Sequence, residues 1–205
     1  MRISFLPQLL ILGTLLSIAG CHVDVEKGKN GEDKNVRIQT PLGGLNVRSN
    51  QTTAADLGLP VYPGAQLTTD DQGDRSADVN MGFGPWRLRV EVVTYQSSDA
   101  QSQVIAFYKK ALGRFGDVLT CQGDQPEGTP AVTGEGLTCR EGSHDNVHVN
   151  GVNIDDSNSG FTLRAGSKHH QHIFALRSSG LGTRFALIEL ELPEGPSGSS
   201  SAPSD

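Results

Sequence analysis

The chain has 205 residues, a formal net charge of −6 and a hydrophobic fraction of 36%, to which glycine adds 25 of 205 residues, about 12%. The sum is ordinary for a globular protein, and the length suits one domain with tails. An acidic chain with only 5% aromatic residues lacks the basic grooves and stacking platforms that nucleic acid requires, so nucleic acid is excluded as a partner.

Residues 1–20 have the layout of an export signal. Arg2 is their only charged residue, the run from Leu9 to Ile18 is uncharged, and the small residues Ala19 and Gly20 stand before a cysteine. The run falls short of the roughly 20 apolar residues that a membrane-spanning helix needs. An ordinary secretory signal with an incidental cysteine is the remaining alternative.

The segment Leu16-Ser17-Ile18-Ala19-Gly20-Cys21 resembles the lipobox of bacterial lipoproteins. The resemblance implies a diacylglycerol thioether on Cys21, cleavage before it, and an acylated N-terminus. His22, rather than Asp, implies release to the outer membrane in a Gram-negative cell. We therefore expect a lipid-anchored protein of the bacterial cell envelope that faces the periplasm. The sequence has no basic amphipathic stretch, so the anchor on Cys21 is the expected membrane contact.

Next in the chain come a linker and a small β-structure. The polar residues 21–35 show no periodicity and are expected to form a flexible tether. Apolar and polar residues alternate on both sides of the Pro/Gly turn at 40–44, which predicts a β-hairpin within residues 36–59. The main domain is expected over residues 60–193, and the Gly/Ser/Pro-rich residues 194–205 are expected to be disordered.

The main domain opens with a strand and a helix. Leu88, Val90 and Val92 alternate with polar residues between Arg87 and Tyr95, which is the period of a half-buried strand. Apolar residues then recur at three- and four-residue spacing from Val104 to Phe115, which predicts an amphipathic helix. The segment Ser98-Asp99-Ala100-Gln101 fits a capping box at its start.

Only short strands are predicted after the helix, at residues 117–121, 136–140, 147–154, 160–164, 172–177 and 183–192. Short antiparallel connections and one long helix predict an α+β domain. We expect an antiparallel twisted sheet with the helix packed on one face, preceded by the small hairpin.

The cysteines form an even pair once Cys21 carries the lipid. An exported chain reaches an oxidising compartment, so we predict a disulfide between Cys121 and Cys139. Two free buried thiols are the alternative.

The histidines are candidate metal ligands. His169, His170 and His172 lie close together, and His144 and His148 precede them. His170 and His172 would point the same way on a strand, and His148 could reach them from a neighbouring strand. The spacing matches no established zinc motif. A polar turn at residues 166–171 that enters a strand is therefore the favoured interpretation, and a metal-binding envelope protein is the alternative function.

Other candidate chemistry is weaker. The acidic segments 155–160 and 70–74 are rich in oxygen ligands, but Gly166 stands where a calcium loop starting at Asp155 needs a bidentate glutamate. Gly82-Phe83-Gly84 leads into a strand rather than a helix, and Ser178-Ser179-Gly180 does not fit a nucleophile elbow. We expect no enzyme and no cofactor.

The segments 58–65, which includes Tyr62-Pro63-Gly64-Ala65, 104–110 and 182–188 together resemble a group of bacterial envelope proteins to which no activity is assigned. The resemblance covers residues 58–192 and implies an exported single domain. The sequence as a whole therefore predicts a membrane-anchored lipoprotein that acts as a non-enzymatic binding or structural module, with an envelope protein as a candidate partner.

Overall fold

The structure is a computed structural model. It describes residues 21–27, 34–69, 73–140, 148–149, 152–153, 160–177 and 182–193. Several features of the sequence lie outside the described residues: the signal at 1–20, the acidic segments 70–72 and 155–159, His144, Ser178, Ser179 and the tail at 194–205. His148 is described by its backbone alone.

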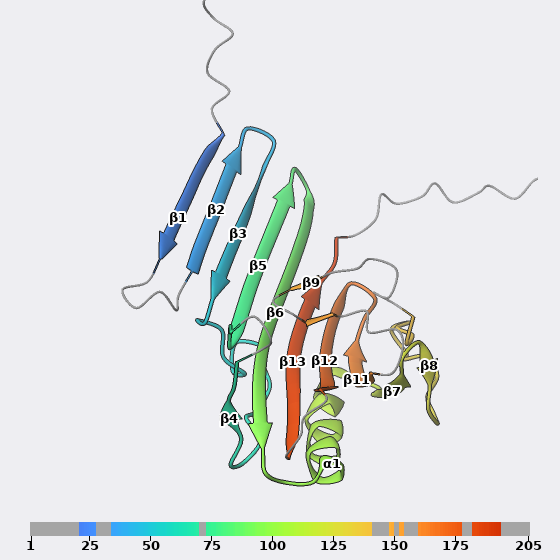
Figure 1. The fold of residues 1–205 in the computed structure, drawn as a ribbon. Coiled ribbons are helices and arrows are strands. Elements are labelled where there is room, and N and C mark those ends of the chain that lie inside the picture. The colour runs from blue at the N-terminus through green and yellow to red at the C-terminus, as the bar shows by residue number, and fades with distance from the viewer. Residues whose placement is uncertain are drawn as a thin grey trace, which may run out of the picture.

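One antiparallel sheet dominates the described part of the chain (Figure 1). Its eleven strands follow the order β1-β2-β3-β5-β6-β13-β12-β11-β7-β8, and β4 also pairs with β6, while β9 and β10 form a separate two-stranded sheet. The described strands are β1 (His22–Lys27), β2 (Lys34–Thr40), β3 (Gly43–Ser49), β4 (Gln66–Leu67), β5 (Ser76–Phe83), β6 (Trp86–Ser97), β7 (Leu119–Gln122), β8 (Gln125–Pro126), β9 (His148–Val149), β10 (Val152–Asn153), β11 (Phe161–Gly166), β12 (His170–Arg177) and β13 (Thr183–Glu191).

The helix α1 (Gln101–Leu112) continues into the short 3-10 helix η1 (Gly113–Phe115). The predicted capping box is wrong: Ala100 is the N-cap residue, and no side chain caps the helix. Asp99 is used elsewhere, because its carboxylate accepts a hydrogen bond from the Tyr62 hydroxyl at 2.7 Å. Among the residues that the structure describes, no helix combines the length and apolarity that crossing a bilayer requires.

The helix packs on one face of the sheet through an aromatic cluster. Tyr108 is fully buried and stacks on Phe174, with ring centroids 5.0 Å apart, and it also contacts Phe185. Its hydroxyl accepts a hydrogen bond from the Tyr62 backbone N–H and donates one to the Pro60 carbonyl. These hydrogen bonds hold residues 60–62 against α1, and the same Tyr108 ring packs on the sheet.

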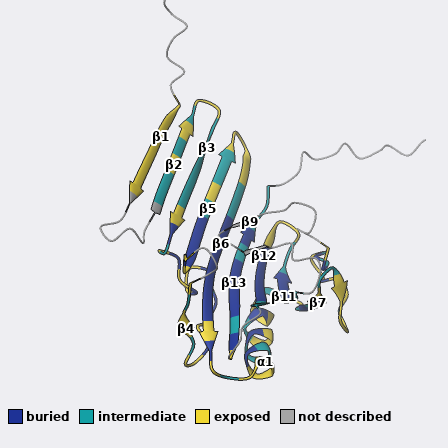
Figure 2. Ribbon diagram, in the orientation of Figure 1, coloured by how far each residue is buried: buried dark blue, intermediate teal, exposed yellow. Residues whose placement is uncertain are grey.

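The opposite face of the central strands is also apolar. Val90, Val92, Ile173, Ile188 and Leu190 are buried there together. Figure 2 shows that burial is concentrated in β6, β13 and β12, whereas β1, β2 and β3 at one edge of the sheet are half-buried or exposed, except for Ser49 at the end of β3. The centre of the sheet is therefore buried on both faces.

These elements confirm the predicted α+β class, with a mostly antiparallel sheet and one short helix. Four segments differ from the prediction. Residues 147–154, expected as one strand, contain the two short strands β9 and β10, which pair with each other. Residues 22–27, expected within the tether, form β1, in which Val23 and Val25 alternate with polar residues. Residues 76–83 form β5, which was not predicted because Ser, Asp, Asn and Gly are poor strand formers and only pairing with β3 and β6 makes them a strand. Residues 136–140 contribute one isolated bridge, between Thr138 and Val132.

Cys121 and Cys139 form the predicted disulfide, with Cα atoms 5.7 Å apart. Both cysteines are buried with Leu119 and Leu137 in a small cluster at the β7 side of the sheet. The loop that the disulfide closes is hydrogen-bonded: the Thr133 hydroxyl accepts a bond from the Leu137 backbone N–H at 3.0 Å. The disulfide therefore holds a structured loop against β7.

We expect the double variant Cys121→Ser/Cys139→Ser to be less stable than the oxidised protein. The cysteines are separated by 18 residues, and closing a loop of this size contributes about 3 kcal/mol in the chain-entropy model. For a chain of this length, that loss lowers the melting temperature by roughly 6–12 °C. Circular dichroism melting without reductant measures the change, and equal melting temperatures for the two proteins would contradict it.

Candidate functional site

A row of charged and polar side chains crosses the sheet. Residues in register on adjacent strands supply it: His172 on β12, Glu189 on β13, Glu91 on β6, Asp78 on β5 and Arg48 on β3. Directly opposite residues of antiparallel strands share a face of the sheet. The face is the one that α1 covers, because His172 and Glu189 lie two residues from Phe174 and Leu187, which belong to the helix core.

Two arginines neutralise part of this row. Arg48 Nη2 lies 2.6 Å from Asp78 Oδ2, and Arg89 Nη2 lies 3.0 Å from Glu91 Oε1. The Glu91 side chain is almost completely buried, and its Oε2 atom has no hydrogen-bond partner. Burial chiefly raises the pKa of Glu91, the nearby Asp78 and Glu189 raise it further, and Arg89 opposes them. The row thus carries more carboxylate than cation.

Three of the side chains form a compact group at the β12 end of the row. His170 Nε2 is 2.7 Å from Glu189 Oε1, and the ring centroids of His170 and His172 are 4.9 Å apart. One ligand atom from each of His170, His172 and Glu189 lies within 4.8 Å of the others. The sequence correctly grouped His170 with His172 but did not identify Glu189, which reaches the group through strand pairing. His169 is not in this group.

A tight turn positions His170. Gly166 ends β11 with φ +104°, and a Cβ at this position would collide with the His170 carbonyl. The Ser167 backbone N–H donates to that carbonyl at 2.8 Å, and the Ser167 hydroxyl accepts a bond from the His170 N–H at 3.1 Å. The predicted polar turn into a strand is therefore confirmed, and it delivers His170 to the edge of the group.

His172 is held by aromatic contacts. Its ring stacks on Phe115 at 3.6 Å with an interplanar angle of 14°. The guanidinium of Arg114 lies 5.1 Å from the centre of the Phe115 ring, and Arg114 Nη1 donates to the Gly58 carbonyl at 2.9 Å. Burial lowers the pKa of His172 more than the charge of Glu189 raises it. A neutral imidazole is therefore favoured in the folded protein.

The group opens onto a pocket of about 460 Å³. Four further segments contribute to its wall: the turn before Leu59, the end of η1, the disulfide loop and the turn after β11. The lining residues are Asp56, Leu57, Gly58, Phe115, Glu135, Gly166, Ser167, His170, His172 and Glu189. Three carboxylates and two imidazoles around one opening suit a ligand that carries positive charge.

A comparison with known proteins finds no matching family model, no similar curated protein and no matching solved structure. The function is therefore inferred from the residues of this chain. Cys21, which was also singled out from the sequence, is a free, exposed cysteine immediately before β1. It lies at the opposite edge of the sheet from β7 and the Cys121–Cys139 disulfide.

Acidification should destabilise the wild type more than the variant His172→Phe, which keeps the stack on Phe115 and cannot titrate. Because the pKa of His172 is lowered in the folded state, the unfolded chain binds more protons below about pH 6.5, and stability falls as the pH falls. Glu189, His170 and Arg114 face this ring and are unchanged in the variant.

Urea unfolding between pH 7.5 and pH 5, with EDTA present, measures the two slopes of unfolding free energy against pH. We expect the shallower slope in His172→Phe. The burial assigned to His172 would be wrong if the two slopes were the same.

Proposed function

We propose that the protein is a bacterial envelope lipoprotein, anchored through acyl chains on Cys21. The segment Leu16–Cys21 carries this proposal, because small residues followed by cysteine end an uncharged run of the right length for an export signal. The accessibility of Cys21 supports it, since a modifying enzyme must reach the thiol. His22 favours the outer membrane and the periplasm as the place where the domain acts.

We infer further that the domain is a non-enzymatic binding module and that the pocket beside His172 receives its ligand or partner. The pocket wall is drawn from β12, β13, the end of η1 and the disulfide loop, so packing and a covalent bond hold its shape. Its carboxylates Asp56, Glu135 and Glu189 favour a cationic group. An envelope protein that presents a lysine or arginine side chain fits this chemistry.

The lipid anchor should depend on the thiol of Cys21. The variant Cys21→Ser cannot form the thioether, so we expect an unprocessed precursor or a soluble species in place of the anchored protein. Intact mass spectrometry of membrane and soluble fractions measures both products. A native protein without acyl mass, or a Cys21→Ser protein with normal processing and anchoring, would refute the proposal.

A second candidate function is the binding of a divalent transition metal by His170, His172 and Glu189. The observation that favours it is the clustering of three ligand atoms within 4.8 Å, two of them from imidazoles. Two histidines and one glutamate form a known zinc set, in which a fourth position is left to water or substrate. Tetrahedral ligands at roughly 2.0–2.1 Å from a zinc ion lie about 3.3 Å from one another. Binding would therefore separate His170 Nε2 from Glu189 Oε1, which are 2.7 Å apart, and draw the group together from its present spread of up to 4.8 Å. The pocket would supply access to that fourth position.

For this candidate, zinc should raise the melting temperature of the wild type relative to a sample with EDTA. Binding stabilises the folded state by about 2.7 kcal/mol when the free ion is at 100 times its Kd. His170→Gln should abolish the rise because it removes one ligand. His169→Gln is the matched control, since His169 is an exposed neighbour outside the group, and it should keep the rise. Identical melting curves with zinc and with EDTA would eliminate the metal site.

A further inference from the structure

The strands β1, β2, β3 and β5 form one edge region of the sheet. One of the two faces of this region is apolar. A row across five strands consists of Val23, Ile38, Leu45, Met81 and Leu88 in register. Two residues further along each strand, the row on the same face is Val25, Val36, Val47, Val79 and Val90. Val79 and Leu88 contact the buried cluster on the face opposite α1. We call these two rows the apolar face.

The intervening rows are polar and point to the other side of the sheet. One contains Asp24, Arg37, Asn46, Asn80 and Arg89 in register. The next contains Arg48, Asp78 and Glu91, whose ion pairs are described above. This part of the sheet is therefore amphipathic, with charges toward α1 and aliphatic side chains away from it.

The apolar face is accessible on β1, β2 and β3, whereas Val90 on β6 is buried. Val23 and Val25 expose 56% and 58% of their surface, and the other residues of β2 and β3 on this face are only partly buried. Five of the large hydrophobic residues with high exposure in the described chain belong to this side of the sheet: Val23, Val25, Leu42, Phe83 and Trp86. Aliphatic and aromatic surface of this extent marks a contact with a partner or a membrane.

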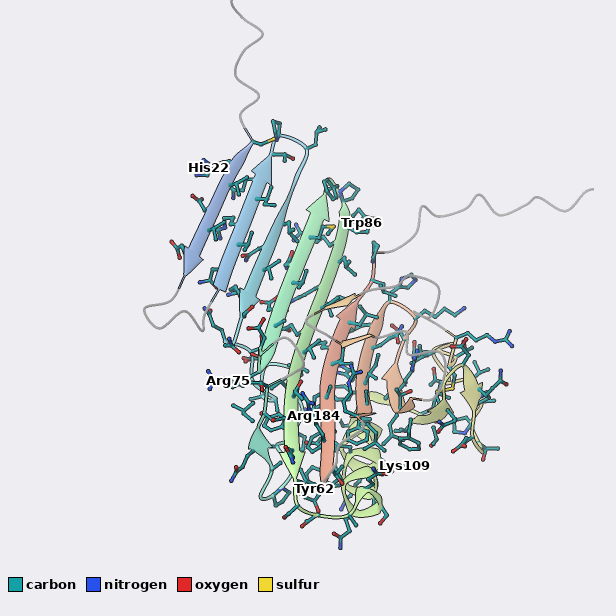
Figure 3. All side chains as sticks on the ribbon, viewed as in Figure 1. His22, Tyr62, Arg75, Trp86, Lys109 and Arg184 are labelled. Atoms are coloured by element: carbon teal, nitrogen blue, oxygen red, sulfur yellow. A yellow bond between two sulfur atoms is a disulfide. The ribbon has the colours of Figure 1, made fainter. Side chains whose placement is uncertain are left out.

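The position of Cys21 identifies the occupant. His22 pairs with Gln39, so Cys21 stands beside Thr40, and the same row continues through Gly43 and Phe83 to Trp86. Cys21, Phe83 and Trp86 are each two residues from a member of the apolar face, namely Val23, Met81 and Leu88. They therefore lie on the same face of the sheet, at the end of the apolar rows. With strands about 4.8 Å apart, four steps place Trp86 about 19 Å from Cys21. In Figure 3, His22 and Trp86 lie at the same end of the molecule.

The aromatic pair and the composition of this face fit a lipid surface. The ring centroids of Phe83 and Trp86 are 6.1 Å apart, and Trp is enriched where protein meets the headgroup region of a bilayer. Among the described residues, the row that contains Phe83 and Trp86 and the two rows of the apolar face have no Asp or Glu, although the whole chain has a net charge of −6. Anionic phospholipid would therefore meet no carboxylate on this face.

We propose that the apolar face, with Phe83 and Trp86 at its end, lies against the surface of the bilayer that holds the Cys21 anchor. The inference rests on the proposed lipidation of Cys21, which brings the membrane to this end of the sheet. The acyl chains supply attachment, and the face supplies orientation. Because the pocket beside His172 is on the opposite face, it is directed away from the membrane into the aqueous compartment.

Trp86 is the only tryptophan of the chain, so its fluorescence reports this end of the sheet directly. The lipidated protein is reconstituted into vesicles of phosphatidylethanolamine and phosphatidylglycerol, with and without lipids brominated on their acyl chains. We expect the brominated lipids to lower the Trp86 fluorescence by about half or more, because the indole of an interfacial tryptophan lies within reach of the upper acyl chains.

A double variant tests the face itself. Val23→Asp/Val25→Asp places charges on the exposed edge of the apolar face and should remove most of the quenching. Val132→Asp is the matched control, because Val132 is 52% exposed and lies in the disulfide loop outside this face; its quenching should equal that of the wild type. Circular dichroism confirms that each variant is folded.

Flotation of the vesicles in a density gradient separates the two proposals. Protein that does not float lacks a working anchor, which overturns the proposed lipidation and the membrane contact together. Protein that floats while its Trp86 remains unquenched is anchored, and it overturns the membrane contact alone. Chemical crosslinking that yields dimers in the same floated, unquenched sample would assign the apolar face to a second copy of the chain.

Discussion

Strand β6 is the element on which the rest of the structure depends. Its twelve residues pair with β5 over Trp86–Val93 and with β13 over Arg89–Ser97, so it joins the exposed side of the sheet to the buried centre. Along this one strand the environment changes from the exposed Trp86 to the buried Val93 and Tyr95. The helix packs only beside the second half, because the aromatic cluster around Tyr108 forms there. The apolar face and the pocket are thus two parts of one continuous sheet, and their relative orientation is fixed by the pairing of β6.

The same continuity explains the buried charges. Where the sheet passes from the helix-covered centre to the open side, Glu91 and Asp78 are buried without complete hydrogen bonding, since Asp78 Oδ1 and Glu91 Oε2 lack hydrogen-bond partners. Asp78 Oδ1 has only a long ion pair, at 3.8 Å from Arg89 Nε. A buried carboxylate costs several kcal/mol unless a cation or a proton compensates for it. Arg48 and Arg89 compensate in part, and burial still holds the pKa of Glu91 above its usual value. Glu189 extends this excess of negative charge to the histidines, which is the physical reason that we propose a cationic ligand for the pocket.

Local sequence signals were sufficient where burial follows periodicity. The amphipathic spacing of Val104, Tyr108 and Leu112 predicted the helix, and alternation around Val90 predicted β6. The cysteine pair was predicted from export and the even number of remaining cysteines, and the structure confirms it, with the Cα atoms of Cys121 and Cys139 5.7 Å apart. The register between strands that are distant in the sequence could not be predicted. Nothing in the sequence indicates that Glu189 pairs with His172, or that Val23 and Leu88 belong to one row across the sheet. The alternating charges of Arg89 and Glu91 were interpreted as an outward face, whereas Glu91 is 3% exposed because the sheet is covered there on both sides. Both the histidine group and the apolar face form because strand pairing aligns residues that are far apart in the sequence.

An acyl anchor by itself leaves a domain free to turn about its tether, and a polar linker would increase that freedom. Here the residue after Cys21 already belongs to β1, so the proposed acyl anchor on Cys21 would join the edge of the sheet without a spacer. A rigid attachment limits which surface can meet the lipid. The sheet face on the side of Cys21 is aliphatic, and the face on the side of the helix carries paired arginines and carboxylates. Turning the charged face to the bilayer would remove these ions from water at a cost that the apolar face does not incur. With the proposed anchor, the short attachment and the two-faced sheet would therefore favour one orientation, in which the acidic pocket faces the aqueous phase.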